Sequence, residues 1–158
     1  MNKICALVLV VLFLSVTGGF AQGRPAWIGQ VEQTLKQKET AWKIGDGLIN
    51  DHGATMYEES FLFKKGALTG VVEIDVYYVL TNPEETFGGL VTVTDNLSKR
   101  AKKTKLAGLG DEGYMWTSSD RNDYTKILFK KDITFVSIWL HGRATAQRVA
   151  KHVAAHIP

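Results

Sequence analysis

Apolar residues recur at helical spacing in three segments of the chain, and each spacing predicts an amphipathic helix. The first helix is expected over 26–38, the second from Pro83 to near Lys99, and the third over 144–157. The second begins with an Asn-Pro-Glu-Glu sequence, in which Asn caps the first turn, Pro fits the first helical position and the glutamates complement the dipole. The three stripes consist of Ile28, Val31 and Leu35; of Phe87, Leu90, Val91, Thr94 and Leu97; and of Ala146, Val149, Ala150, Val153 and Ile157.

Alternating and apolar segments between these helices predict β-strands. Segments 56–64 and 70–80 flank the Lys-Gly-Ala-Leu-Thr stretch at 65–69, which predicts a hairpin with a longer loop. Residues 42–52 are rich in Gly and Asp, and we expect them to be irregular apart from one short strand. The remaining predicted strands span 114–118, 124–130 and 133–141.

The strand at 70–80 has one apolar and one polar face, since strand side chains alternate. The apolar face carries Val72, Ile74 and Val76, and the polar face carries Glu73, Asp75 and Tyr77. This alternation is typical of an antiparallel sheet that is covered on one face. We expect the second and third helices to cover the apolar face and to leave the polar face for contacts with a partner.

The strand at 133–141 is apolar on both faces, which predicts a central position in the sheet and places Trp139 in the core. The element order is helix, hairpin, helix, three strands and helix. It predicts a single α+β domain over 22–158, in which helices pack mainly on one face of an antiparallel β-sheet.

Residues 1–21 have the pattern of a secretory signal peptide. Lys3 precedes an apolar run over 4–16, and Gly19 and Ala21 are the small residues that a signal peptidase reads. The run is shorter than the ~18 residues that a membrane-spanning helix needs. We therefore expect a soluble protein in the periplasm or the medium, with no integral membrane segment after cleavage.

Charge and cysteine content exclude several functions. The 158-residue chain has 19 basic and 16 acidic side chains, and its net charge of +3 is too small to indicate a nucleic-acid partner. Cys5 is the only cysteine and lies in the predicted leader, so the exported chain would have no disulfide, thiol nucleophile or cysteine metal ligand. No G-x-S-x-G nucleophile elbow, zinc-protease helix motif or phosphate-binding loop is present, and we expect no cofactor.

Four features follow one another in residues 78–158. They are the Asn-Pro-Glu-Glu helix start, a Gly-Leu-Gly-Asp-Glu-Gly-Tyr loop that enters a strand, a hairpin with an apolar second arm, and a terminal Ala/Val helix. In this order they resemble small uncharacterised bacterial exported α+β domains, similar to the extracytoplasmic sensor-like domains of kinases and lipoproteins. The resemblance implies a fold, whereas such domains share no agreed activity, so no catalytic residue is carried over.

The loop glycines match the G-x-G-x-x-G spacing of dinucleotide-binding loops. Such a loop opens a helix, whereas a strand pattern follows here, and Asp111 and Glu112 would repel phosphates. We interpret Gly108, Gly110 and Gly113 as turn residues, with Asp111 or Glu112 bonding nearby backbone amides.

Two residue pairs have spacings that chemistry could use. His152 and His156 lie one helical turn apart, as in a two-histidine metal site, but no third ligand is identifiable, and histidines at a helix C-terminus also suit its dipole. Glu73 and Asp75 lie roughly 7 Å apart on one strand face, within the ~5–9 Å that acid–base hydrolysis uses. The simpler explanation for this carboxylate pair is a solvated sheet face on which lysines of the hairpin partner strand lie opposite the two carboxylates.

Cationic and aromatic residues are candidates for contacts with a partner. The lysine-rich segment 99–105, with Lys102 and Lys103, could hold an anionic partner, although a solvated helix end that complements its dipole is the simpler interpretation. Tyr77 and Trp116 are aromatic candidates.

We therefore expect a secreted or periplasmic, non-enzymatic binding or accessory domain. Its envelope or extracellular partner, an anionic one among the candidates, would meet the face of Glu73, Asp75 and Tyr77 or the adjacent lysine segment. The alternative is a small hydrolase or metal-dependent enzyme that uses the Glu73/Asp75 pair or the His152/His156 pair.

Overall fold

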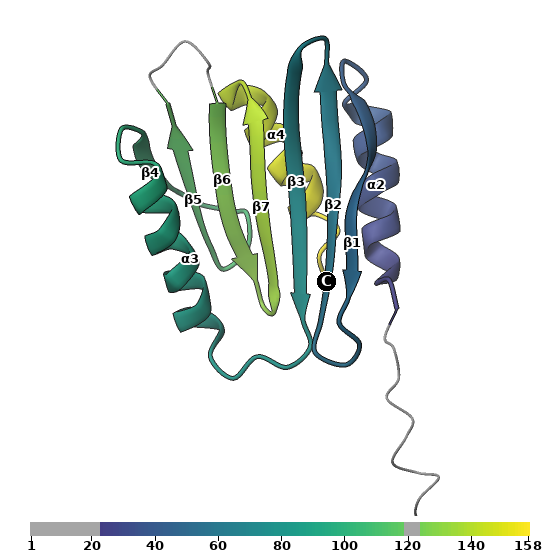
Figure 1. Ribbon diagram of the computed structural model, residues 1–158, viewed down its shortest axis with the longest axis vertical. Coiled ribbons are helices and arrows are strands. Elements are labelled where there is room, and N and C mark those ends of the chain that lie inside the picture. Colours follow the sequence, from purple (N-terminus) through teal and green to yellow (C-terminus); the bar gives the residue numbers. More distant parts are fainter. Residues whose placement is uncertain (1–22, 119–123) are drawn as a thin grey trace, which may run out of the picture.

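A computed structural model describes residues 23–118 and 124–158, so the predicted leader lies outside the described residues. The described residues form three helices and seven strands (Figure 1). The helices are α2 (Ala26–Lys38), α3 (Pro83–Leu97) and α4 (Arg143–Ala154). The strands are β1 (Lys43–Asp51), β2 (Met56–Lys65), β3 (Leu68–Tyr77), β4 (Lys102–Leu106), β5 (Glu112–Thr117), β6 (Tyr124–Lys131) and β7 (Thr134–His141).

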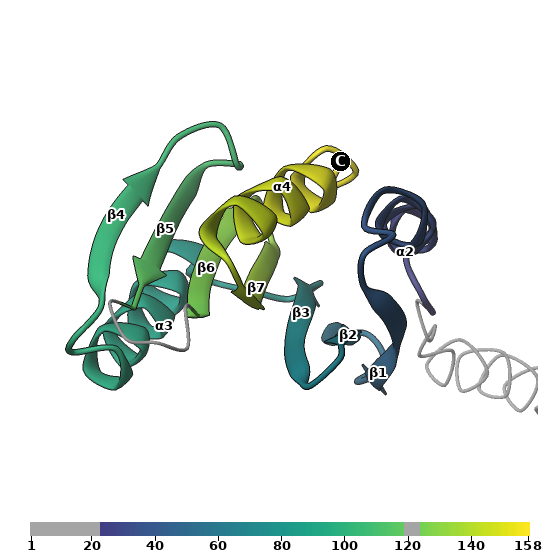
Figure 2. The same cartoon turned by 90° about the horizontal axis from the view of Figure 1, so that it is seen from above.

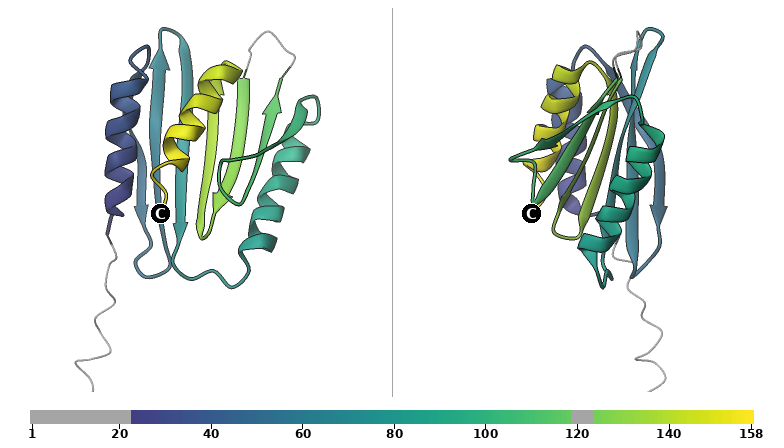
Figure 3. Two further views of the ribbon diagram at one scale, coloured as in Figure 1. Left: turned by 180° about the vertical axis from the view of Figure 1, so that it is seen from behind. Right: turned by 90° about the vertical axis from the view of Figure 1, so that its left-hand side faces the viewer.

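The described strands form a single antiparallel sheet in the order β1-β2-β3-β7-β6-β5-β4. The apolar strand β7 is central, as its sequence predicts. Helices α2 and α4 lie on one face of the sheet, and α3 lies on the other (Figures 2 and 3). The predicted α+β class, with one antiparallel sheet and helices mainly on one face, is confirmed.

The larger core lies between the sheet and the helices α2 and α4. Its fully buried helical side chains are Ile28, Val31, Leu35, Ala146, Val149, Ala150 and Val153. The sheet contributes the apolar face of β3, Val72, Ile74 and Val76, together with the matching faces of its neighbours. The stripe of α4 therefore covers the apolar face of β3 as predicted, and the stripe of α2 packs beside it.

Helix α3 covers the face opposite to the one predicted. The second core consists of Phe87, Trp116, Leu128 and Phe135, with Leu90 and Val91 at its margin. The ring centroids of Phe87 and Phe135 lie 5.6 Å apart. An apolar stripe shows that a helix buries one side but does not say against which face, and both faces of β7 are apolar. Leu97, the last residue of the predicted stripe, is 78% exposed.

Two edge strands differ from the prediction. Residues 43–51, expected to be mostly irregular, form the nine-residue β1. Residues 102–106, expected near a helix end, form β4. Both strands lie at sheet edges, where charged residues protect the unpaired side, so neither shows a clear apolar alternation. The β2–β3 turn is shorter than predicted: only Gly66 (φ 60°) and Ala67 separate the strands.

The predicted helix start at Asn82 is confirmed. Asn82 Oδ1 accepts a hydrogen bond from the Glu85 N–H at 3.2 Å, and the Asn82 amide donates to the Glu85 carboxylate at 2.8 Å. These reciprocal bonds satisfy backbone and side-chain groups at the first turn of α3.

The glycine loop leads into β5 and not into a helix, as expected. Gly108 and Gly110 have φ values of 76° and 128° and are turn residues as predicted. The interpretation of Gly113 as a turn residue is wrong, because β5 already begins at Glu112 and Gly113 lies outside the positive-φ region. Asp111 Oδ2 accepts a hydrogen bond from the Asp132 N–H at 2.7 Å. The Asp111 carboxylate therefore ties the loop to the β6–β7 turn.

Candidate functional site

The face of the sheet opposite α2 and α4 is only partly covered, because α3 lies at the end of the sheet formed by β4 and β5 (Figures 1 and 2). Cross-strand register places its remaining side chains in rows. We call this uncovered part the open face, and it consists of Glu58, Ser60, Leu62, Val71, Glu73, Asp75, Lys126, Ser137 and Trp139.

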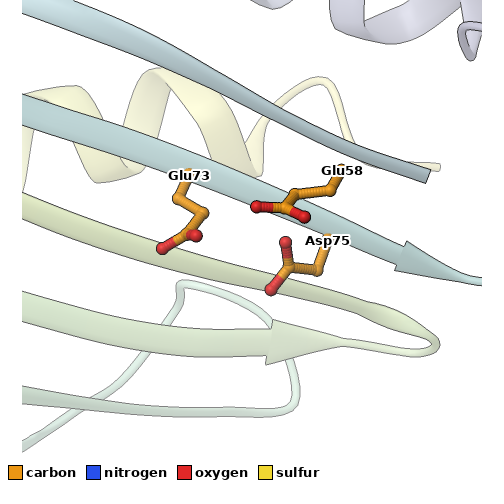
Figure 4. Close-up of side chains that lie close together, drawn as sticks. All are labelled: Glu58, Glu73 and Asp75. Atoms are coloured by element: carbon orange, nitrogen blue, oxygen red, sulfur yellow. The ribbon is translucent and has the colours of Figure 1, made fainter. Parts of the chain in front are cut away.

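Three carboxylates meet on the open face, where the sequence predicted two (Figure 4). Glu58 of β2 lies directly opposite Asp75 of β3, and Glu73 lies beside them. One oxygen from each side chain lies within 4.8 Å of the other two. The expectation that lysines face Glu73 and Asp75 from the hairpin partner is wrong, because Ser60 and Glu58 occupy those positions.

Burial and repulsion raise the pKa values of Asp75 and Glu73. Burial, followed by the charges of Glu73 and Glu58, raises the pKa of Asp75 to about 7. Burial and the Glu58 charge also raise the pKa of Glu73, against the opposing charge of Lys126. Asp75 Oδ1 is buried with no hydrogen-bond partner among the described residues. Such a group can exchange a proton near neutral pH, and the three carboxylates offer oxygen ligands of the kind that hard cations prefer.

Tyr77 lies on the same side of the sheet, toward α3. Its ring centroid is 4.9 Å from that of Phe135, and the ring packs against the second core. Burial, with a smaller contribution from the charge of Asp75, raises the pKa of Tyr77. Tyr77 is therefore a half-buried packing residue at the border of the open face.

A pocket of about 490 Å³ lies at the C-terminal end of α3, beside β5, β6 and β7. Its walls include the cationic side chains of Lys99, Arg100 and Lys126, and the apolar side chains of Leu97, Trp116 and Trp139. Trp139 is 50% exposed, so the expectation that it lies in the core is wrong. The reason is that α3 lies at the end of the sheet formed by β4 and β5 and does not cover this end of β7 (Figure 1).

Trp116 is buried between the sheet and α3, at 2% exposure. Its Nε1–H donates to Asp95 Oδ1 at 2.8 Å, and Lys103 Nζ lies 2.7 Å from Asp95 Oδ2. Lys103 Nζ also lies 4.5 Å from the centroid of the Tyr114 ring. The bonds from Lys103 and Trp116 lower the pKa of Asp95, which thereby ties α3 to β4 and β5.

The lysine-rich segment is divided between a strand and the pocket. Lys102 and Lys105 are exposed on β4, whereas Lys99 and Arg100 follow the end of α3 and line the pocket. The interpretation of the whole segment as a helix end is therefore wrong, because its second half is a strand. The predicted binding roles of Lys102 and Lys103 stay predictions.

His152 of α4 and His156, which follows the end of α4, lie beside the C-terminal part of α2. Helix α4 ends at Ala154 and is therefore shorter than the predicted 144–157. His156 Nε2 lies 2.9 Å from Thr34 Oγ1, and His152 Nε2 lies 3.7 Å from Glu39 Oε1. Arg148 donates to both oxygens of the buried Glu39 at 2.7 and 2.6 Å. Among the described residues, neither histidine belongs to a group of three side chains spaced to hold a metal ion. The two-histidine metal site belongs to the alternative enzyme and still lacks a third ligand among the described residues.

A second, smaller pocket of about 250 Å³ lies between the glycine loop and α4, with Gly108, Gly110 and Lys151 in its walls. The three clustered carboxylates line neither pocket. Lys126, which lines the larger pocket, interacts with the charge of Glu73, so the carboxylate cluster borders that pocket without lining it.

These features define a class of protein: a single-sheet α+β domain with one covered sheet face and one open face, which carries a carboxylate cluster beside a cation-lined pocket. Comparisons with protein families, curated proteins and solved structures found no match for this chain. Among the described helices, none is both long and apolar enough to cross a membrane.

Proposed function

We propose that this chain is an exported, non-enzymatic binding domain that binds its partner at the open face and the adjacent pocket. One observation carries the proposal: large apolar side chains are exposed there beside a half-buried cation. Leu62 is 39% and Trp139 is 50% exposed, and no carboxylate oxygen of the described residues lies within 4.0 Å of Lys126 Nζ. A face that meets only water has no need of this combination.

Export is part of the proposal and is supported by the signal-peptide pattern of residues 1–21 and by the resemblance to exported sensor-like domains. Expressed with its leader in a bacterium, the chain should be recovered outside the cytoplasm about 2 kDa lighter than the 17.5 kDa precursor. Full-length chain in the membrane pellet would contradict export as a cleaved protein.

Site-specific photo-crosslinking tests whether the open face binds a partner. A photoreactive phenylalanine analogue is introduced at Leu62 on β2 and, as a matched control, at the exposed Gln37 on α2. After irradiation in the source cell, we expect adducts of defined mass from position 62 that excess unmodified protein suppresses, and none from position 37. Equal adducts from both positions, or none from position 62, would contradict the proposed surface.

A small hydrolase that uses Glu73 and Asp75 is the second candidate, and the pKa of Asp75 at about 7 favours it. A carboxyl with this pKa suits a general acid or base near neutral pH. Its position outside both pockets argues for binding instead, because enzymes hold such groups in a cleft. Turnover of chromogenic esters or glycosides that is lost in Asp75→Asn and kept in the exposed Asp46→Asn control would establish the enzyme.

A further inference from the structure

We propose that the pocket at the end of α3 binds an anionic amphiphile, whose acidic head group pairs with Lys126 and whose apolar body covers Trp139 and Leu97. The inference rests on the proposed binding function and names its ligand class. A free fatty-acid-like molecule and an anionic lipid in a bilayer share this chemistry, and the experiment below separates them.

Among the described residues, the charged side chains of the pocket wall are all cationic. Lys99, Arg100 and Lys126 line it, and none of its other lining residues in the described part of the chain is an aspartate or glutamate. The chain as a whole is nearly balanced in charge, so this segregation is local. A cavity with cationic walls attracts and orients an anionic head group.

Lys126 is the cation that gains most from an anion. Its side chain is half-buried in β6, and burial lowers its pKa while the charge of Glu73 raises it. No carboxylate oxygen of the described residues lies within 4.0 Å of its Nζ. A bound carboxylate or phosphate would replace the hydration that the ammonium loses on burial, through a charge-assisted hydrogen bond.

The apolar part of the same wall is uncovered. Leu97, in the last turn of α3, is 78% exposed, and Trp139 is 50% exposed. Trp139 lies directly opposite Lys126 in the β6–β7 register, so one small molecule can meet both side chains. Removing this apolar surface from water favours an alkyl or aryl body, which a compact inorganic anion lacks.

The dimensions agree with a single-chain ligand. The pocket volume of about 490 Å³ lies within the range of roughly 300–1,000 Å³ that is usual for small-molecule sites. Val71 and Leu62 continue the row of Trp139 across β3 and β2. The apolar track therefore leaves the pocket along the open face, as an extended chain would.

Calorimetry with matched amphiphiles tests the ligand class. The full chain, expressed with its leader and purified, is titrated with dodecanoate, with dodecylammonium and with acetate. We expect dodecanoate to bind at least about tenfold more tightly than dodecylammonium, and acetate to give no measurable binding. Equal affinity for the two long-chain probes, or no dodecanoate binding at about 1 mM, would overturn the proposal.

Three lysine variants test the head-group contact. Lys126→Met should weaken dodecanoate binding about tenfold and remove the preference over dodecylammonium, whereas Lys126→Arg should stay within about threefold of the parent. Lys38→Met, at the exposed end of α2, is the matched control and should change nothing. A folded Lys126→Met protein with parental affinity would refute the contact. If thermal melting shows that this variant does not fold, Trp139→Ser must show the same tenfold loss, and parental affinity there refutes the proposal.

Phosphatidylglycerol vesicles separate the two sources of the ligand. Dodecanoate binding without vesicle association supports a free amphiphile, and vesicle association that dodecanoate competes away supports a lipid taken from a bilayer. Vesicle association without dodecanoate binding overturns the pocket as the site. If position 62 gives specific crosslinks but dodecanoate does not bind, the proposal of a binding domain stands and the proposal of an amphiphile ligand is overturned.

Discussion

Asp75→Asn should stabilise the folded protein above neutral pH, although the side chain is partly buried. The Asp75 carboxyl lies within 4.8 Å of the Glu58 and Glu73 carboxyl oxygens, and its pKa is about 7 in place of the ordinary 3.8. Asparagine has the shape of the protonated carboxyl and stays neutral at every pH. Its amide can also donate a hydrogen bond to a neighbouring glutamate.

The sign of the effect follows from proton binding. Between pH 3.8 and about 7 the folded carboxyl holds its proton while the unfolded one has released it, so the free energy of unfolding falls as pH rises through this window. The stabilisation that the folded protein gains from holding this proton is fully present below pH 3.8 and is lost above about pH 7. The difference between the two pKa values corresponds to about 4 kcal/mol. Because water screens part of the cluster, we expect about half of that, about 2 kcal/mol.

Urea unfolding of the parent and the variant at about pH 4 and about pH 8 measures the effect. We compare the free energy of unfolding of Asp75→Asn with that of the parent at each pH. We expect the variant minus the parent to be about 2 kcal/mol more favourable at the higher pH than at the lower pH. Asp46→Asn, exposed on β1, should show the same small difference at both. An effect of Asp75→Asn that does not change with pH, or that becomes more destabilising as pH rises, would refute the reasoning.

Gly110→Ala should lower the stability of the folded protein by about 2 kcal/mol, measured by thermal melting, because φ is 128° and an added Cβ would clash with a β6 carbonyl oxygen. Gly108→Ala should lower it less, because the space around Gly108 is open. Arg148→Met should lower the free energy of unfolding in urea by about 2 kcal/mol, because it leaves the buried Glu39 carboxylate without its arginine. Adding Glu39→Gln should recover most of this loss, and an equal loss in the double variant would contradict the role of Arg148. Asn82→Ala should cost about 1 kcal/mol in the same assay by removing the cap of α3, and an unchanged midpoint would show that the cap is dispensable.

Features that depend on neighbours within a turn or a strand could be read from the sequence. The bounds of α2 and the start of α3 follow from apolar periodicity and from capping by Asn82, because these interactions join residues a few positions apart. The two faces of β3 follow from strict alternation for the same reason. The glycine loop was separable from a nucleotide loop because the segment after Gly113 has a strand pattern.

The tertiary structure decided which surfaces meet. The apolar stripe of α3 predicts that the helix is buried on one side. Which face of the sheet it covers follows only from the packing of Phe87 on Phe135, because β7 has apolar side chains on both faces. That packing left Trp139 exposed and created the pocket beside Lys126. Glu58 joined Glu73 and Asp75 because a two-residue turn set the β2–β3 register, and a shift of one residue would have turned its carboxylate to the other face. Periodicity along one segment fixes which residues share a side of that segment, whereas a binding surface depends on contacts between segments that are distant in the chain.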